Sequence, residues 1–262
     1  MKIAPLIPYN IRNNTPINFK SSSRNVCDFG KGIEYQTTTC LFRDDVDWKN
    51  LVNILEKKFK KTDKVNVIIH ACSSGEEALS FALRLDLILG NKAEKYYPIV
   101  AKDFDMLNIE MAKNGIFEVN ENELNMLNKY TKSDNKDYEI VQKGSRKFLV
   151  TRQKGVIKNI EFSQADILKD INNIPEENTV LFCRNFWPYL KIEERNDMIK
   201  QLAKKLKPSS IVILGAFDSY YGIPNVFENE GFKKHANNYL MLEKLPKYRM
   251  LLKKLVKKVF SI

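Results

Sequence analysis

The chain of 262 residues is long enough for one α/β domain with additions or for two small domains. Its hydrophobic residues (44%) and charged residues (29%) are in globular proportions, which excludes a wholly disordered chain. The net charge of +11 admits nucleic acid, anionic lipid or an acidic protein as a partner, but a chain generally rich in lysine and asparagine makes this excess a weak guide.

The sequence argues against a membrane-spanning protein, a secreted protein and a fold held together by a metal ion. No apolar run approaches the roughly 20 residues that span a bilayer, and residues 1–16 lack the apolar core of a signal peptide, so we expect a cytoplasmic protein. The four cysteines are scattered without C-x-x-C spacing, at Cys27, Cys40, Cys72 and Cys183. We therefore expect reduced thiols and no metal site. We also expect a monomer.

The first part of the chain predicts an arm followed by a helix. Residues 1–36 contain Pro, Asn and Ser with little periodicity, so we expect a loosely structured arm. Large apolar residues then recur at helical spacing from Trp48 to Phe59. This pattern predicts an amphipathic helix that ends in the lysine-rich run at 57–61.

The stretch at 65–77 is the most informative in the chain. Residues 65–71 are mostly apolar and rich in β-branched side chains, as expected of a central parallel strand buried on both faces. Residues 73–75, Ser-Ser-Gly, predict a tight turn with hydroxyls to cap a helix, and Glu76 and Glu77 fall in its first turn, where the helix dipole favours anions. Open α/β sheets bind ligands at such a turn.

A second strand and its following helix continue the pattern. The apolar stripe after Glu77 predicts a helix with Gly90 as its C-cap, and residues 97–101 predict the next strand. Asp103 follows that strand, where a carboxylate can accept hydrogen bonds from both hydroxyls of a ribose. The alternative role is an N-cap of a helix at 106–113, which Asp105 fits better.

Residues 119–157 interrupt the alternation, because they are polar and rich in Asn, Asp and Lys. We interpret them as an insertion with short antiparallel strands. The remaining predicted elements are strands at 160–165, 179–185 and 211–215, a helix at 192–206 and a closing antiparallel hairpin at 231–232 and 238–242. Alternating strands and helices predict an α/β fold.

Five segments form a recognisable series. They read TCLFRD at 39–44, ACSSGEEALS at 71–80, AKDFD at 101–105 with Ala112, Gly115 and Phe117 downstream, CRNFWPYL at 183–190 and LGAFD at 214–218. In order, they resemble the motifs T-x-F-F-R-D/E, A-A/C-S-S/T-G-E-E-P-Y-S, A-T-D-I-D, C-R-N-V-x-x-Y-F and a G-H-S-E-like turn. These motifs belong to the CheR family of S-adenosylmethionine-dependent methyltransferases, which methylate glutamates on bacterial chemoreceptors. The departures, Ala78-Leu79, Lys102 and Ala216, are not residues that we assign to chemistry.

The resemblance implies a Rossmann-like class I methyltransferase fold over residues 37–245, with a mostly parallel seven-stranded sheet flanked by helices and a small β-subdomain inserted at 119–157. It implies S-adenosylmethionine as cofactor and an enzyme that methylates a protein carboxylate, with glutamate of a chemoreceptor-like signalling protein as acceptor. Only 36 residues precede Thr37. They are too few for most of the N-terminal helical domain that family members use in docking receptor helices, so the acceptor stays open.

The resemblance also assigns cofactor-binding residues by position. They are Thr37, Thr39, Arg43, Gly75, Glu77, Asp103, Asp166, Ile167, Arg184 and Asn185. Asp103 would bind the ribose. Asp166 and Ile167 would flank the adenine, and Arg184 and Asn185 would lie beside the methionine end.

Arg43 and Tyr189 match the pair that the family places nearest the reacting groups. A glutamate carboxylate is ionised at neutral pH and needs no general base. It needs a cation and a donor to orient it, which an arginine and a tyrosine can provide. The alternatives are an ion pair of Arg43 with Asp44 or Asp47 and a core position for Tyr189 beside Trp187. The resemblance favours the catalytic roles.

Residues 246–262 form an addition beyond the family core. Leu251, Leu252, Leu255, Val256, Val259 and Phe260 share one helical face, and Lys253, Lys254, Lys257 and Lys258 share the other. A basic amphipathic helix at 247–262 can lie on an anionic membrane, which would place the protein peripherally at the inner membrane surface. An ordinary terminal helix docked on the domain explains the pattern equally well.

Two other functions compete with the enzyme. One is a regulatory module that binds S-adenosylmethionine or S-adenosylhomocysteine without turnover, but retention of Arg43 and Tyr189 favours catalysis. The other is methylation of nucleic acid, which only the basic charge supports. The chain lacks the N/D-P-P-Y/F type of motif, so we expect no nucleic-acid partner.

Overall fold

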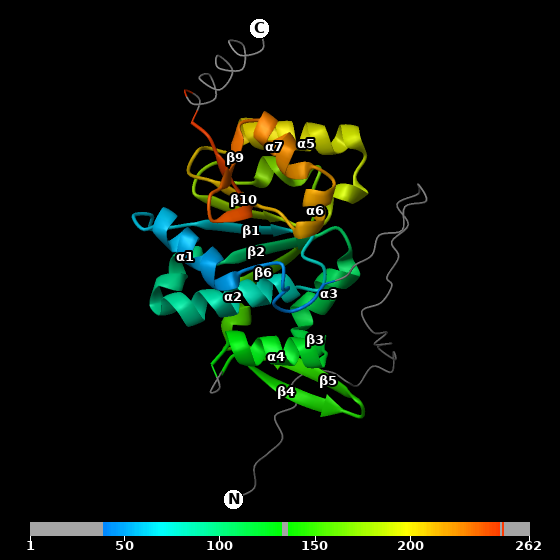
Figure 1. Ribbon diagram of the computed structural model, residues 1–262. Helices are drawn as coiled ribbons and strands as arrows, with labels where there is room; N and C mark the ends of the chain where they lie inside the picture. Colours follow the sequence, from blue (N-terminus) through cyan, green and yellow to red (C-terminus); the bar gives the residue numbers. More distant parts are fainter. Residues whose placement is uncertain (1–38, 133–135, 247, 249–262) are drawn as a thin grey trace, which may run out of the picture.

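The computed structural model describes residues 39–132, 136–246 and 248, and these residues form two β-sheets with helices around them (Figure 1). Three predictions fall outside this range. They are the arm at 1–36, the cofactor-binding role of Thr37, and all but two residues of the helix at 246–262. The larger sheet has the order β6-β2-β1-β7-β8-β10-β9, and the smaller one has the order β3-β5-β4.

The strands of the larger sheet are β1 (Asn66–His70), β2 (Ile99–Asp103), β6 (Ile160–Gln164), β7 (Thr179–Cys183), β8 (Ile211–Ile213), β9 (Phe232–His235) and β10 (Asn238–Lys244). β1 lies inside the sheet and pairs in parallel with β2 and β7, so that His70 stands opposite both Lys102 and Cys183. β10 runs antiparallel to β8 and β9. These pairings confirm the predicted mostly parallel seven-stranded sheet with a closing hairpin.

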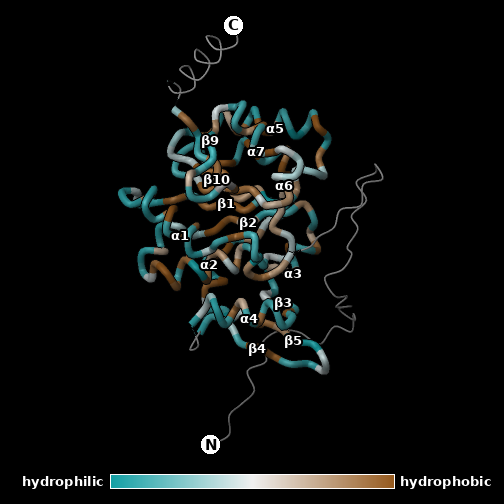
Figure 2. Tube along the Cα trace, viewed as in Figure 1, coloured by the Kyte–Doolittle hydropathy of each residue, from teal (hydrophilic) through white to brown (hydrophobic). Residues whose placement is uncertain are grey.

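Two layers of helices cover this sheet. The α-helices are α1 (Trp48–Lys58), α2 (Glu76–Leu89), α3 (Met106–Asn114), α4 (Glu121–Tyr130), α5 (Ile192–Lys205), α6 (Ala216–Tyr220) and α7 (Ile223–Asn229). Short 3-10 helices are η1 (Gly90–Tyr96), η2 (Val156–Asn159), η3 (Asp170–Asn173) and η4 (Trp187–Tyr189). The apolar core forms one cluster under α1 and α2 and another under α5 and α7. Figure 2 shows the hydrophobic residues concentrated along the central strands, as a doubly covered sheet requires.

The turn between β1 and α2 depends on a glycine rather than on the predicted serine cap. Gly75 is the N-cap of α2 with φ 96°, and no side chain caps the helix. Ser74 Oγ instead donates to the Glu76 carboxylate at 2.9 Å. A Cβ at Gly75 would approach Ala112 Cβ and the Phe162 ring to 3.0 Å. The prediction of hydroxyl capping was therefore wrong, because the left-handed turn and close packing leave room only for glycine.

The smaller sheet combines β3 (Ile116–Val119), which begins ahead of the predicted insertion at 119–157, with β4 (Tyr138–Lys143) and β5 (Arg146–Thr151) inside it. Both pairings are antiparallel, as predicted. The helix α4 was not predicted, although its signal is present. Asn120 and Glu123 form a capping box at its start, with each side chain bonded to the other residue's backbone N–H at 3.0 Å.

Asp218 connects the segments that follow β7 and β8. Its side chain is buried, and its Oδ2 accepts the N–H groups of Asn185 and Gly215, each at 2.8 Å. Its Oδ1 is buried without a hydrogen-bond partner among the residues that the structure describes. Burial raises the pKa of Asp218 to about 7, although both N–H bonds oppose the rise.

This carboxyl predicts a pH-dependent stability. Between about pH 4 and pH 7 the folded chain keeps a proton on Asp218 that the unfolded chain releases, so the free energy of unfolding falls as pH rises. Asp218→Asn cannot lose this proton. We expect urea unfolding to show that the variant gains stability relative to the wild type between pH 4 and pH 8, by on the order of 4 kcal/mol at most.

Asp63→Asn is the matched control for this measurement, because Asp63 is exposed. Its stability relative to the wild type should stay constant over the same range of pH. A constant difference for Asp218→Asn as well would contradict the prediction.

Candidate functional site

A cavity of about 860 Å³ opens at the carboxyl edge of the large sheet, where β1, β2, β6 and β7 end. Its size suits a small-molecule ligand, and its position is the usual ligand site of an open α/β sheet. The predicted site residues that line it are Thr39, Arg43, Glu77, Asp103, Asp166, Ile167, Arg184, Asn185 and Tyr189. Gly75 does not line it but shapes the adjoining turn. The sheet topology therefore gathers residues that lie far apart in the sequence.

Several residues around the cavity have an unusual backbone. Ala71, Ser73 and Asn185 line the cavity with φ of 54°, 50° and 60°, and Phe42 beside Arg43 has φ 49°. Non-glycine residues in this region cost about 1–3 kcal/mol each and persist only where neighbouring contacts hold them. Strain is therefore concentrated at the cavity.

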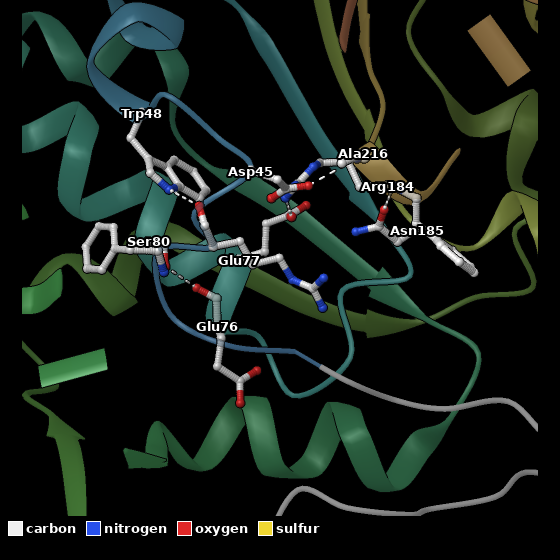
Figure 3. Close-up of polar contacts among 12 residues, drawn as sticks. Asp45, Trp48, Glu76, Glu77, Ser80, Arg184, Asn185 and Ala216 are labelled. Atoms are coloured by element: carbon white, nitrogen blue, oxygen red, sulfur yellow. Dashed lines mark hydrogen bonds and ion pairs between the residues drawn. The ribbon is translucent and has the colours of Figure 1, made fainter. Parts of the chain in front are cut away.

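The guanidinium of Arg184 lies at the end of β7 between two carboxylates (Figure 3). Its Nη2 lies 2.6 Å from Asp45 Oδ1, and its Nη1 bonds Glu77 Oε2. Burial opposes the charge on Arg184, but both carboxylates outweigh burial and raise its pKa. Burial alone would raise the pKa of Asp45. The charge of Arg184 and the hydrogen bond from the Ala216 N–H, at 3.1 Å, outweigh burial and lower that pKa.

Asp45 is a cavity-lining residue that the sequence analysis missed. It stands two residues after Arg43, in a segment without regular secondary structure. The resemblance carried no role for this position. The only local signal was its place directly after the TCLFRD segment.

Asp103 holds the turn after β1 and faces the cavity. Its Oδ2 accepts the Ser73 N–H at 2.7 Å, and its Oδ1 accepts the Asp105 N–H at 2.9 Å. Asp105, rather than Asp103, caps α3 by accepting the Leu107 N–H at 2.9 Å. Burial raises the pKa of Asp103, and the two N–H bonds oppose the rise. Each oxygen can accept a further donor from a ligand in the cavity.

The loop after β6 forms another wall of the cavity. Asp166 and Ile167 line it together with Phe104, which follows β2 and has 48% of its surface exposed. Asp166 Oδ1 accepts the Leu168 N–H at 3.0 Å, which fixes the loop. An exposed ring and an aliphatic side chain beside a carboxylate suit a flat heterocycle with an amino group.

Arg43 and Tyr189 both line the cavity, although they lie far apart in the sequence. Tyr189 also packs against the core cluster that contains Trp187, as the alternative role considered for it requires. Burial raises the pKa of Tyr189, Tyr221 raises it further, and the charge of Arg43 opposes the rise.

A largely buried ionic network at the cavity was also missed. Asp170 Oδ2 lies 3.0 Å from His70 Nε2 and 2.7 Å from Lys102 Nζ. Burial opposes the charge on Asp170, but bonds from His70 and Lys102 lower its pKa well below the usual range. His70 and Lys102 line the cavity. His70 is buried at the end of β1, and its partner Asp170 lies 100 residues away in the sequence.

Metal-ligand clusters and membrane-spanning helices are both absent from the described residues. Within them, no group of three or more His, Cys, Asp or Glu side chains is arranged to hold a metal ion. No helix in the same part of the chain is long and apolar enough to cross a membrane.

Known proteins resemble this chain over most of the described range. The model of the family described as "CheR methyltransferase, SAM binding domain" matches residues 37–236. The chemotaxis protein methyltransferase of Salmonella typhimurium is 26% identical over 166 residues, which cover 63% of this chain and 56% of the relative. Chemotaxis protein methyltransferase 2 of Vibrio cholerae is 26% identical over 173 residues, which cover 64% and 56%.

The chain therefore spans about half the length of the curated relatives that it matches. Among solved structures, PKMT2 from Rickettsia typhi in complex with AdoHcy is 18% identical with a TM-score of 0.34, over 58% of this chain and 21% of that one. The family match covers most of the chain and contains all five segments on which the resemblance rested. The chain belongs to the CheR methyltransferase family and carries its S-adenosylmethionine-binding domain.

Proposed function

We propose that this protein transfers a methyl group from S-adenosylmethionine to a protein carboxylate, with glutamate of a chemoreceptor-like signalling protein as the acceptor. The observation that carries the proposal is the cavity. It combines the ion pairs of Arg184 with Asp45 and Glu77, the carboxylate of Asp103 and the pair of Arg43 and Tyr189. The named chemotaxis methyltransferases among the relatives support the choice of acceptor.

The cavity residues fit S-adenosylmethionine at both ends. Its amino-acid end carries an ammonium and a carboxylate, and the set of Asp45, Glu77 and Arg184 offers two acidic groups and one basic group. The acidic excess favours the ammonium, and the guanidinium favours the carboxylate. Asp103 would accept the ribose hydroxyls, and Ile167 would pack against the adenine.

The cofactor supplies an electrophilic methyl group on a sulfonium, so the protein has to position the acceptor and needs no strong base. A glutamate carboxylate is already ionised at neutral pH. Arg43 would hold that carboxylate through its planar guanidinium, and the Tyr189 hydroxyl would donate a hydrogen bond to orient it. Correct alignment of an attacking oxygen can supply much of the rate of such a displacement.

The location belongs to the same proposal. We expect a monomer that acts in the cytoplasm, with the basic helix predicted at 247–262 either on an anionic membrane or on the domain. Sedimentation with anionic liposomes, before and after deletion of 247–262, separates the two. Binding that is absent, or that survives the deletion, would contradict the membrane site.

Calorimetry with S-adenosylhomocysteine, followed by methyl transfer from labelled S-adenosylmethionine to a cell extract, tests the function. We expect binding, and protein label that mild base releases as a carboxyl ester would be. Absence of binding would contradict the cofactor assignment. Binding without transfer would favour the regulatory module, and label on nucleic acid or base-stable label would contradict the carboxylate acceptor.

Asp103→Ala should weaken S-adenosylhomocysteine binding by at least about a hundredfold, because two charge-assisted hydrogen bonds to the ribose are lost. Calorimetry measures the affinity. Asp103→Asn keeps one acceptor and should lose less. Glu161→Ala, an exposed substitution on β6, is the control and should bind normally. Normal binding by Asp103→Ala would contradict the ribose role.

Arg43→Ala should lower methyl transfer at saturating cofactor by at least about a hundredfold, because the acceptor carboxylate loses its cation. Circular dichroism should show an unchanged fold. Arg43→Lys keeps the charge without the planar group and should recover part of the rate. Lys49→Ala, on the exposed side of α1, is the control. Normal turnover by Arg43→Ala would show that the catalytic role is wrong.

A further inference from the structure

Glu123 of α4 extends beyond its own helix to the segment that carries Arg43. The residue is only 8% exposed, and its Oε1 accepts the Leu41 N–H at 2.9 Å. Its Oε2 accepts the Asn120 N–H at 3.0 Å. Leu41 stands 82 residues before Glu123 and two residues before Arg43. One carboxylate therefore connects the helix between β3 and β4 with the wall of the cavity.

Two other helices hold the residues that follow Leu41. The Phe42 N–H donates to the buried Ser80 Oγ of α2 at 2.9 Å. The Arg43 carbonyl accepts from Trp48 Nε1 of α1 at 3.2 Å (Figure 3). Three consecutive residues are thus fixed by side chains of α4, α2 and α1.

The middle residue of the three is the strained one. Phe42 has φ 49°, and its side chain is only 1% exposed. Its ring lies 5.3 Å from the ring of Tyr130, the last residue of α4. Such a backbone persists only while its surroundings hold it. α4 holds this backbone in two ways, because Glu123 accepts the N–H of the preceding Leu41 and the Tyr130 ring packs on the Phe42 ring.

We infer that Glu123 is a positioning residue for methyl transfer, which fixes the Leu41 to Arg43 segment so that Arg43 stays at the cavity. The inference rests on the proposed function, in which Arg43 orients the acceptor. Because α4 connects β3 to β4, a displacement of the smaller sheet reaches Arg43 through this hydrogen bond.

Hydrogen exchange of the full chain, measured for peptides that contain residues 41–43, tests the contact without an acceptor. Glu123→Ala should speed exchange of these amides by about tenfold, because a charge-assisted hydrogen bond is lost. Glu123→Gln should give a smaller increase. Asn120→Ala removes the other half of the capping box but leaves the Leu41 bond, so it is the matched control. Equal acceleration in Glu123→Ala and Asn120→Ala, or none in either, would overturn the inference.

Methyl transfer from labelled S-adenosylmethionine to a cell extract gives the functional comparison. At saturating cofactor, Glu123→Ala should slow the initial rate by about tenfold or more, while its affinity for S-adenosylhomocysteine changes by less than about threefold. Glu123→Gln should recover part of the rate, and Asn120→Ala should keep it. A rate loss matched by lost affinity, or no loss, contradicts the positioning role.

The two failures remain distinguishable. A wild-type chain that binds S-adenosylhomocysteine but labels no protein would contradict the proposed function. The exchange comparison would then still decide whether Glu123 holds the segment.

Discussion

The charge of Arg184 is buried, and the structure around the cavity depends on how that charge is compensated. Only 2% of its side chain is exposed, and its two partners are Glu77 in the first turn of α2 and Asp45 ahead of α1. Removal of one partner from a buried ion pair costs about 3–5 kcal/mol, because the other charge stays unpaired. The end of β7, the start of α2 and the segment before α1 are therefore tied together. The same groups form one end of the cavity.

A second constraint acts on the turns that follow β1 and β7. In each turn a carboxylate accepts the backbone N–H of a residue with positive φ. Ser73 and Asn185 both have positive φ, and each donates its backbone N–H to a buried or half-buried carboxylate. Asp103 holds Ser73, and Asp218 holds Asn185, at 2.7 and 2.8 Å. Both carboxylates accept a second N–H from another turn. Two acidic side chains thus stabilise the strained backbone that shapes the cavity floor.

Local pattern predicted the regular elements well, because apolar periodicity and glycine positions act within a few residues. The β1 turn, the helix capped by Asp105 and the antiparallel insertion all follow from such signals. Residues 183–185 show where the pattern misleads. The predicted strand ran to Asn185, but β7 ends at Cys183, because Asn185 adopts φ 60° to meet Asp218.

Ion pairs between residues far apart in the sequence could not be predicted from the sequence alone. The motif resemblance brought Arg184 and Glu77 to one site, but it gave no hint that Asp45 completes their ion pair. His70 ends β1 and Asp170 begins η3, 100 residues further along the chain, and only the folded topology brings them together. Such contacts depend on tertiary topology, so no local signal identifies them.

The segment before α1 is anchored at both of its ends. At its start, Glu123 of the smaller sheet's helix holds Leu41, and at its end Arg184 and the Ala216 N–H hold Asp45. Arg43 lies between these two anchors. A segment fixed at both ends cannot shift at one end without straining the other, and Phe42 already has a strained backbone. The position of Arg43, which we propose holds the acceptor, is therefore constrained from two sides, by the ion pair of Asp45 with Arg184 and by the helix of the inserted sheet.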